Sequence, residues 1–568
     1  MSLSVKCQSC KNSFVIEDGD LGFYQKMQVP APTFCPSCRF FRRSIWRNEH
    51  FFFKKKEEHT GNFIFSSYPS SSKVKIYEHG YWWSDKWDPK SYGRNYDFNI
   101  TFFEQFSDLL HSVPLCARSI ENCINSDYSN YATNIKNAYL CFNATDSENV
   151  SYGFRFSGSQ DCVDFYETKD SSLCYETFSI VDSERMFWSS DCANCYNLWF
   201  SSNCRNCNDC FGCVNLRDKK YCIFNEHYPK EEYEEKFKKI YDGSFLRVQE
   251  ILKKIKDLKI KFPMQYIHGN RNKNVKGDYI YASNNALECF VIHNIDNARF
   301  SQFVRHSKDI YDFTNWGLAC ELIYESANCG ENSQNLKFCY ECWPSSHDLE
   351  YCVECHSSSY CFGCVGLQKA KYCIFNKQYH REEYFSLRAK IIEQMNTLPY
   401  ISIDGLPYKY GEFFPPEFSP FTYEQSSASD YFPKNNHSEI SNNYDVEILS
   451  SELPEKISNT NDSIIGKVIE CQDAQKCAHR CVSAFKITQM ELQFYKHFNI
   501  PLPRICPNCR FYIRMEKLNQ IMSRNGVCMC KNNSHDHTNQ CSRKFKTNYS
   551  SNNPQIIFCE KCYKQEIY

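Results

Sequence analysis

The sequence predicts a mainly β protein with some helix, in which a duplicated cysteine-rich repeat lies between small zinc-binding modules. Residues 23–43 (FYQKMQVPAPTFCPSCRFFRR) return in diverged form as residues 494–514 (FYKHFNIPLPRICPNCRFYIR). Residues 211–233 return as residues 362–384, and apolar residues or cysteines recur every 12 residues before each copy. A fixed short period with β-prone residues is typical of a solenoid or a repetitive sheet.

The length, charge and cysteine content of the chain limit the kinds of protein that it can be. A chain of 568 residues predicts several domains, and its net charge of -1 requires any nucleic-acid contact to come from a local patch. The sequence shows no apolar signal-peptide run and no segment typical of a membrane helix. We therefore expect a cytoplasmic protein without membrane contact, or a host-cytoplasm or virion protein if it is viral. In a reducing compartment the 36 cysteines would bind metal or stay free, whereas disulfides would require an unusual export route.

The N-terminal module, residues 1–60, contains two short-spaced cysteine pairs, Cys7 with Cys10 and Cys35 with Cys38. Two such pairs supply the four thiolates of a tetrahedral structural zinc site. Pro36 suits a turn that enters a helix, which favours a treble-clef finger over a plain zinc ribbon.

A basic and aromatic stretch, residues 39–56, follows the second pair. Basic side chains neutralise phosphates and aromatic rings stack on unpaired bases, so the stretch is a possible nucleic-acid contact. The alternative is that the aromatic side chains form the core of the module and the charges its solvated surface. The candidate contact residues are Arg39, Arg42, Arg43, Arg47, Lys54, Lys55 and Lys56.

Residues 61–115 form an aromatic-rich segment with a helix predicted near residues 101–111. The apolar residues of that helix recur at helical spacing, and Pro114 ends it. They are Phe102, Phe103, Phe106, Leu109 and Leu110.

Two cysteine-rich repeat blocks follow, residues 116–262 and 263–423, each ending in predicted helices. The helices are expected at residues 231–240, 244–260 and 382–395. We expect a right-handed β-solenoid over residues 116–228 and 280–379, and the alternative is a string of small hairpins that each bind a metal. The inward row of the first block is Ala138, Val150, Cys162, Cys174, Met186, Leu198, Cys210 and Cys222, and turn residues precede it at Asn137, Asn149, Asp161 and Asn206.

The second block follows the period less strictly, through Ala286, Ala298, Ile310 and Leu322. The repeat cysteines allow two interpretations. Isolated ones such as Cys162 and Cys174 suit a buried interior, because a free thiol behaves as a small hydrophobe. For the dense run Cys192, Cys195, Cys204, Cys207, Cys210 and Cys213, added zinc or redox sites are an equal alternative.

Residues 424–465 read as a disordered linker, because they are polar and without periodicity. The C-terminal module, residues 466–568, predicts a zinc site from Cys477, Cys481, Cys506 and Cys509, with Cys471 or His479 as competitors for the first place. A further site would use Cys541, Cys559 and Cys562 with Cys530 or Cys528, and His535 and His537 stand in reserve. We expect two to three structural Zn²⁺ ions, with more possible in the repeats.

Several motifs together resemble a family of uncharacterised cysteine-rich proteins found in candidate-phylum bacteria and giant DNA viruses. These motifs are residues 23–49, WWSDKWDP, the repeated FGCV-to-EEY segment, GEFFPPEFSPF and FCEKCY. The resemblance covers nearly the whole chain and implies two zinc sites in the N-terminal region. This chain departs from that pattern at Glu57, Thr60, Glu78 and Tyr81.

No common catalytic motif occurs in the sequence. The leading hypothesis is a non-enzymatic zinc-binding scaffold that contacts a protein or nucleic acid; its oligomeric state is open. The alternatives are an enzyme acting on a polymer or carbohydrate in a solenoid groove, and a thiol redox protein. A convergent carboxylate pair on one repeat face would favour the enzyme, and an aromatic face without one would favour binding.

Overall fold

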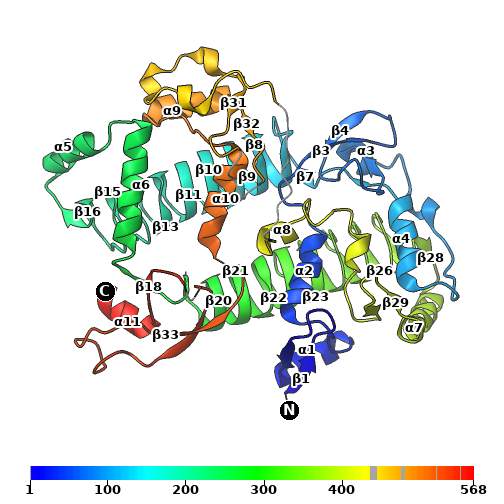
Figure 1. Ribbon diagram of the computed structural model, residues 1–568. Helices are drawn as coiled ribbons and strands as arrows, with labels where there is room; N and C mark the ends of the chain where they lie inside the picture. The colour runs from blue at the N-terminus through cyan, green and yellow to red at the C-terminus, as the bar shows by residue number, and fades with distance from the viewer. Residues whose placement is uncertain (1, 435–443, 475–479, 520, 551) are drawn as a thin grey trace.

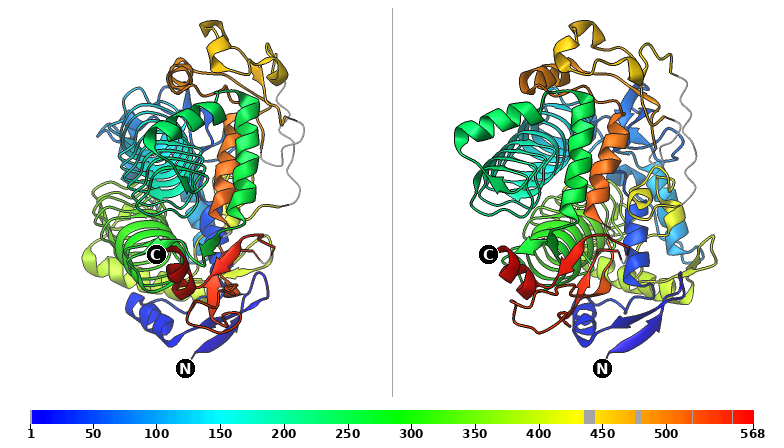
Figure 2. Two further views of the ribbon diagram at one scale, coloured as in Figure 1. Left: turned by 90° about the vertical axis from the view of Figure 1, so that its left-hand side faces the viewer. Right: turned by 60° about the vertical axis from the view of Figure 1, so that its left-hand side comes forward.

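Two long ladders of mostly parallel strands organise the computed structural model, which describes residues 2–434, 444–474, 480–519, 521–550 and 552–568 (Figure 1). Ladder 1 runs from β7 to β17 and ladder 2 from β19 to β28. The ladders lie side by side, and the modules that contain the two termini pack against them (Figure 2). The predicted mainly β character with some helix is confirmed.

The elements before and within ladder 1 have the following bounds. They are β1 (Leu3–Lys6), β2 (Ser13–Ile16), α1 (Asp18–Met27), α2 (Pro36–Ile45), β3 (Phe53–Lys56), β4 (Phe63–Ser66), β5 (Ile76–Tyr77), α3 (His79–Trp82), a 3-10 helix (Pro89–Tyr92), α4 (Phe102–Ser112), β6 (Leu115–Cys116), β7 (Ile120–Glu121), β8 (Ser129–Tyr139), β9 (Cys141–Ser157), β10 (Gln160–Lys169), β11 (Ser172–Val181), β12 (Glu184–Phe187), β13 (Ser190–Ala193), β14 (Tyr196–Trp199), β15 (Asn208–Phe211), β16 (Lys220–Ile223) and β17 (Glu226–His227).

The elements that connect the ladders and form ladder 2 are α5 (Lys230–Ile240), α6 (Phe245–Lys259), β18 (Pro263–Gln265), β19 (Gly269–Asn270), β20 (Lys273–Tyr281), β21 (Asn284–Arg299), β22 (Gln302–Gly317), β23 (Glu321–Gly330), β24 (Gln334–Lys337), β25 (His347–Glu350), β26 (Ser359–Phe362), β27 (Lys371–Ile374), β28 (Lys377–Gln378), α7 (Arg381–Thr397), β29 (Tyr400–Ile401) and β30 (Pro407–Tyr408).

The remaining elements are a 3-10 helix (Pro416–Phe418), α8 (Ala428–Tyr431), three more 3-10 helices (Ser450–Glu452, Ile457–Asn459 and Asp462–Ile464), β31 (Ile469–Glu470), β32 (Ala484–Phe485), α9 (Gln489–Phe498), α10 (Pro507–Met515), a 3-10 helix (Glu516–Leu518), β33 (Arg524–Val527), β34 (Lys544–Thr547), β35 (Ile556–Phe558) and α11 (Glu560–Ile567).

The parallel pairing of ladder 1 follows the predicted 12-residue period. Cys162 pairs with Val150 and Val163 with Tyr175, and every residue of the predicted inward row is buried. The turn residues Asn137 and Asn149 have φ of 51° and 55°, in the left-handed region that asparagine tolerates better than most residues. The period therefore reports the length of one strand-and-turn unit.

Ladder 2 departs from the period in its middle, which corrects one predicted position. Ile310 pairs with Ile323, Ile323 with Leu336 and Leu336 with Leu349, so these units contain 13 residues. Leu322, which the 12-residue period placed inward, is only half-buried. The period returns to 12 where Leu349 pairs with Cys361.

The predicted helices are confirmed as α4, α5, α6 and α7. The buried face of α6, formed by Val248, Ile251 and Ile255, packs in one core with the aromatic row on the outside of ladder 1. That row contains Tyr175, Phe187, Trp199 and Phe211. In the part of the chain that the structure describes, no helix is long and apolar enough to cross a membrane.

The two ladders run in opposite directions past each other (Figure 1). Near the start of ladder 1, the Tyr131 hydroxyl lies 3.1 Å from that of Tyr340, late in ladder 2. Farther along ladder 1, Glu167 accepts a 3.1 Å ion-pair contact from Arg305, near the start of ladder 2. These contacts join the ladders along one side.

Each terminal module docks on the ladder that is distant from it in sequence. The N-terminal helix α2 lies on ladder 2, and the C-terminal helix α10 lies on ladder 1 (Figure 1). Arg39 and Arg43 of α2 contact Asp312 at 2.9 and 3.4 Å. Because residues four apart share one helix face, both guanidinium groups reach the same carboxylate.

The C-terminal module makes the equivalent arginine–aspartate contact with ladder 1. Arg510 and Arg514 of α10 lie 2.9 and 3.0 Å from Asp164 of ladder 1. Asp164 and Asp312 occupy matching positions, because each lies two residues after a buried inward residue, Cys162 or Ile310. A second acid completes each cluster, Glu325 for α2 and Glu176 for α10.

These contacts correct the predicted nucleic-acid surface. Arg39, Arg42, Arg43 and Arg47 are at most 2% exposed and pair with carboxylates. Lys55 is also buried and donates to the Pro69 and Ser72 carbonyls at 3.0 and 2.7 Å, and only Lys54 and Lys56 are exposed. The four arginines and Lys55 therefore stabilise the fold by buried contacts.

The predicted disordered linker, residues 424–465, is ordered where the structure describes it. α8 and three 3-10 helices lie in it, and Leu453, Ile457 and Ile464 are buried in the same core as α6. Sparse apolar residues suffice here because ladder 1 and the neighbouring helices supply most of this core. Residues 435–443 of this prediction lie outside the described residues.

The arginine clusters give a first prediction. Replacing Asp312→Asn leaves Arg39 buried without a counter-charge and Arg43 with Glu325 alone, so we expect a loss of about 3–5 kcal/mol in the stability of the docked module. Asp164→Asn should do the same at the other end. The measurement is the thermal midpoint together with limited proteolysis around α2 or α10. Asp296→Asn, an exposed residue of ladder 2, is the control, and equal behaviour of all three variants would contradict the prediction.

Candidate metal centres and the cleft between the ladders

Cys7, Cys10, Cys35 and Cys38 come together as predicted, with their sulfur atoms within 4.8 Å of one another. Cys7 and Cys10 lie in the turn between β1 and β2, and Cys35 is the N-cap residue of α2. The Cys10 and Cys35 sulfurs are 3.7 Å apart. A tetrahedron with metal–sulfur bonds of about 2.3 Å has edges of about 3.8 Å, so the group fits one metal ion.

The second group contains Cys471, Cys481, Cys506 and Cys509, so the competitor Cys471 takes the first place. The Cys481 and Cys506 sulfurs are 3.8 Å apart, and Cys506 and Cys509 are 3.5 Å apart. Cys477, the residue that the short spacing favoured, lies outside the described residues, as does His479. Cys471 follows β31 as Cys7 follows β1, a correspondence that pair spacing alone does not reveal.

The third group contains Cys528, Cys541, Cys559 and Cys562. Of the two residues left open for its first place, Cys528 is the one that joins this group, and Cys530 does not. Cys530 instead meets His535, His537 and Cys562, again with all ligand atoms within 4.8 Å. The seven residues of these two groups all lie in the C-terminal module, and Cys562 belongs to both.

The N-terminal copy holds itself together differently at the place of the third group. Glu57 accepts hydrogen bonds from the Thr60 hydroxyl and backbone, and Glu78 accepts one from the Tyr81 backbone at 3.2 Å. His59 stacks on Tyr81 with ring centroids 3.7 Å apart. No metal-ligating group forms at these positions among the described residues, so hydrogen bonds and stacking close this turn.

One thiol in each of the first two groups is poised to ionise. Hydrogen bonding from Cys38 lowers the pKa of Cys35 to about 5. Hydrogen bonding from Cys471 lowers the pKa of Cys506 as well. Both residues are N-caps, where the helix dipole favours a negative charge, and a thiolate is the form that binds metal.

The repeat cysteines lie inside the ladders, apart from the metal groups. Cys162 and Cys192 are buried and their thiols donate to carbonyls two residues earlier, both at 3.2 Å. The metal-ligating groups found among the described residues all belong to the terminal modules. For Cys162, Cys174 and the dense run 192–213, the structure therefore agrees with the buried-thiol interpretation.

A cleft of about 500 Å³ lies where the ladders face each other. Its walls repeat, because lining residues such as Tyr131, Asn143 and Arg155 lie one unit apart in ladder 1. Successive units are about 4.8 Å apart, so the cleft is a row of regularly spaced side chains. Its aromatic residues are Tyr131, Tyr279, Tyr281, Phe303, Trp316 and Trp343, and its charged residues are Glu121, Asp146, Arg155, Glu167, Lys169, Arg305, Glu331 and Glu341.

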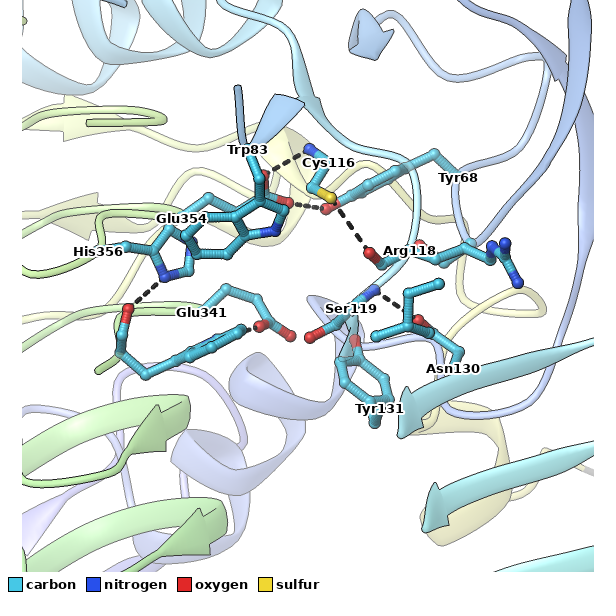
Figure 3. Close-up of a pocket in the computed structure, with 13 residues that line it drawn as sticks. Tyr68, Trp83, Cys116, Arg118, Ser119, Asn130, Tyr131, Glu341, Glu354 and His356 are labelled. Carbon is cyan, nitrogen blue, oxygen red and sulfur yellow. Dashed lines mark hydrogen bonds between the residues drawn. The ribbon is translucent and has the colours of Figure 1, made fainter. Parts of the chain in front are cut away.

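Glu341 and Trp343 also line a smaller cavity of about 20 Å³ beside the cleft, with room for about one water molecule (Figure 3). Glu354 lies in this cavity, one ladder unit from Glu341, because Tyr340 pairs with Val353. The Glu354 carboxylate accepts hydrogen bonds from the Tyr68 hydroxyl at 2.8 Å and the Cys116 backbone at 2.7 Å. It thereby anchors the segment before ladder 1 to ladder 2.

Burial perturbs the titratable groups of this region. Desolvation raises the pKa of Glu341 to about 7 and that of Glu354 to about 8. Desolvation lowers the pKa of His356 and of His293 to about 3, so both imidazoles are neutral. Near neutral pH, Glu354 is thus mostly protonated, whereas Glu341 titrates in this range.

Sequence reasoning missed both glutamates and the cleft tryptophans. A signal was available, because Asn315, Asn328, Glu341 and Glu354 recur every 13 residues as a polar row. Asn315 donates to Asn328 at 3.1 Å and Asn328 donates to Glu341 at 2.9 Å along this row. A 12-residue period does not reveal this row, because its residues lie 13 apart.

No protein-family model and no curated protein matches this chain. The geometry of its own sites therefore carries the functional inference.

The raised pKa of Glu354 gives a second prediction. Since the folded pKa lies above the unfolded value, this group favours folding fully only below about pH 4.5, and its contribution falls as pH rises toward 8. Glu354→Gln mimics the protonated carboxyl and should stay constant over this range. We expect similar thermal midpoints at pH 5 and a higher midpoint for the variant at pH 8. A midpoint difference that does not change between these pH values would contradict the assignment.

Proposed function

We propose that this protein is a zinc-stabilised scaffold that binds a polar polymer chain in the cleft between its two ladders. The ladders are, in this proposal, two β-solenoid blocks, and the terminal modules are zinc-ribbon or treble-clef folds that fix them side by side. The observation that carries the proposal is the cleft itself, because both ladders line it and their side chains there are both aromatic and polar.

Zinc is the metal that the thiolate groups favour. Four sulfur ligands in a closed tetrahedron suit zinc, and a complete ligand set leaves no open position for water. This chemistry supports a structural role for the three four-cysteine groups. The thiolates at the N-termini of α2, α10 and α11 would then fix where these helices begin.

The cleft favours a carbohydrate over a nucleic acid. Its lining contains three cationic side chains, Arg155, Lys169 and Arg305, against five carboxylates, and the two lining histidines are not cationic sites for phosphate. A phosphate backbone needs an excess of positive charge. Sugar rings instead pack on aromatic faces and bond to planar amide and carboxylate groups, which this cleft supplies in regular order.

Glu341 supports a second candidate, a polymer-cleaving enzyme. A carboxyl group with a pKa of about 7 at the edge of a cleft can donate a proton to a leaving group near neutral pH. Glu354, one unit away, is fully hydrogen-bonded by Tyr68 and Cys116 and is occupied as an anchor. Binding is therefore the better-supported function, and cleavage would have to rely on Glu341 with another carboxylate of the cleft.

The proposal predicts at least three zinc ions per chain after expression in a reducing cytosol, one for each four-cysteine group. It also predicts binding of neutral oligosaccharides. Trp316→Ala and Trp343→Ala should each weaken that binding at least about tenfold, because both rings line the cleft. Trp188→Ala, a half-buried tryptophan of ladder 1 outside the cleft, is the control.

Zinc analysis and calorimetry with the oligosaccharides, beside a single-stranded DNA oligonucleotide, measure these outcomes. Fewer than one zinc per chain would contradict the zinc-stabilised scaffold. DNA binding that weakens steeply as the salt concentration rises would favour a nucleic acid over a carbohydrate as the ligand of the cleft. Turnover of an oligosaccharide that Glu341→Gln abolishes, but Glu321→Gln on the exposed edge of β23 does not, would establish the enzyme instead.

A further inference from the structure

The C-terminal module contains two adjacent ligand groups that have one residue in common. Cys528, Cys541, Cys559 and Cys562 form one group, and Cys530, His535, His537 and Cys562 form the other. The Cys562 sulfur lies within 4.8 Å of every other ligand atom in each group. A thiolate has several lone pairs, so one sulfur can bind two metal ions at once.

We propose that this module binds two zinc ions in one dinuclear centre, with Cys562 as the bridging thiolate. Each ion then has four ligands, three of its own and the shared sulfur, as tetrahedral zinc requires. The inference rests on the proposal that the four-cysteine groups bind zinc and adds a metal that this proposal does not need.

The spacing of the second group fits zinc. The Cys530 sulfur lies 3.1 Å from Nδ1 of His535, and the Cys562 sulfur lies 3.5 Å from Nε2 of His537. With zinc bonds of about 2.3 Å to sulfur and about 2.0–2.1 Å to nitrogen, a tetrahedral sulfur–nitrogen edge is about 3.5 Å. Only small shifts would bring these atoms around one ion.

The outer ring nitrogens of both histidines are oriented as in metal sites. Nε2 of His535 lies 3.3 Å from a carboxylate oxygen of Glu566, and Nδ1 of His537 lies 2.7 Å from the Asn539 carbonyl. Each acceptor holds a proton on the outer nitrogen, which leaves the lone pair of the inner nitrogen pointing at the cysteines. Metal-binding histidines have this carboxylate or carbonyl partner almost without exception.

Charge favours a second cation. One zinc with four thiolates leaves a net charge of about −2 in a buried site, because Cys528, Cys541 and Cys562 are at most 5% exposed. Adding one zinc and the Cys530 thiolate brings the centre to about −1. Sharing Cys562 thus lowers the buried negative charge.

The added ligands lie on one insertion. The loop between β33 and β34 contains Cys530, His535 and His537, whereas the corresponding loop between β3 and β4 spans only residues 57–62. The N-terminal copy, with the shorter loop, has no metal group at this place among its described residues. The longer loop and the second ligand group thus occur in the same module, as a dinuclear centre requires.

Two neighbouring cysteines of α11 provide the test. Cys562→Ser removes a ligand from both ions, whereas Cys559→Ser removes one from the first ion only. Native mass spectrometry of the full-length protein counts bound zinc. We expect four ions in the wild type, three in Cys559→Ser, three in His537→Ala and two in Cys562→Ser. Asn552→Ala, in the same module and away from both groups, is the control and should keep four.

A second measurement does not depend on how the variants fold. After replacement of zinc by cadmium-113, two cadmium signals of the wild type should show mutual coupling through the shared sulfur, and the two isolated sites should give uncoupled signals. Three ions in the wild type, or equal counts in Cys562→Ser and Cys559→Ser, would overturn the dinuclear centre. Three ions would leave the proposed scaffold intact, so the two failures are distinguishable.

Discussion

The structure depends on two buried clusters of arginines and carboxylates that join the terminal modules to the ladders. In each, two arginines of one helix face reach the same aspartate, Asp312 or Asp164, and both partners are buried. A buried charge without its partner costs several kcal/mol, so each module has one acceptable docking position. Because the modules dock on the distant ladder, these clusters also hold the two halves of the chain together.

The cysteine groups prepare the helices for this contact. Cys35 and Cys506 are N-caps with nearly the same backbone angles, and the docking arginines begin four residues later, one helical turn on. A metal ion bound at the N-cap would fix where the helix starts and therefore where its arginines point. The cysteine groups and the arginine contacts thus position the two ladders together, and the cleft results from that position.

Much of this fold could be predicted from the sequence, because the patterns that reveal it lie within short stretches of the chain. The 12-residue period reports one strand-and-turn unit, so it located the buried row from Ala138 to Cys222. Cysteine spacing found Cys7, Cys10, Cys35 and Cys38 because those ligands come in short pairs. Where the spacing left more than one candidate ligand, as for Cys471 and Cys528, only the three-dimensional structure shows which residue joins the group. The burial of Arg39, Arg42 and Arg43 could not be predicted from the sequence, because the carboxylates that pair with them lie some 270 to 370 residues away.

The central claim is that bound metal positions α2 and α10 so that their arginines lock the ladders. Hydrogen–deuterium exchange of the full-length protein before and after zinc chelation tests it most directly. On removal of zinc, exchange should rise in α2 and α10 and in the strands that contain Asp312 and Asp164, while the cysteine-filled interiors of the ladders stay protected. Unchanged exchange in both helices after complete loss of zinc would contradict this account.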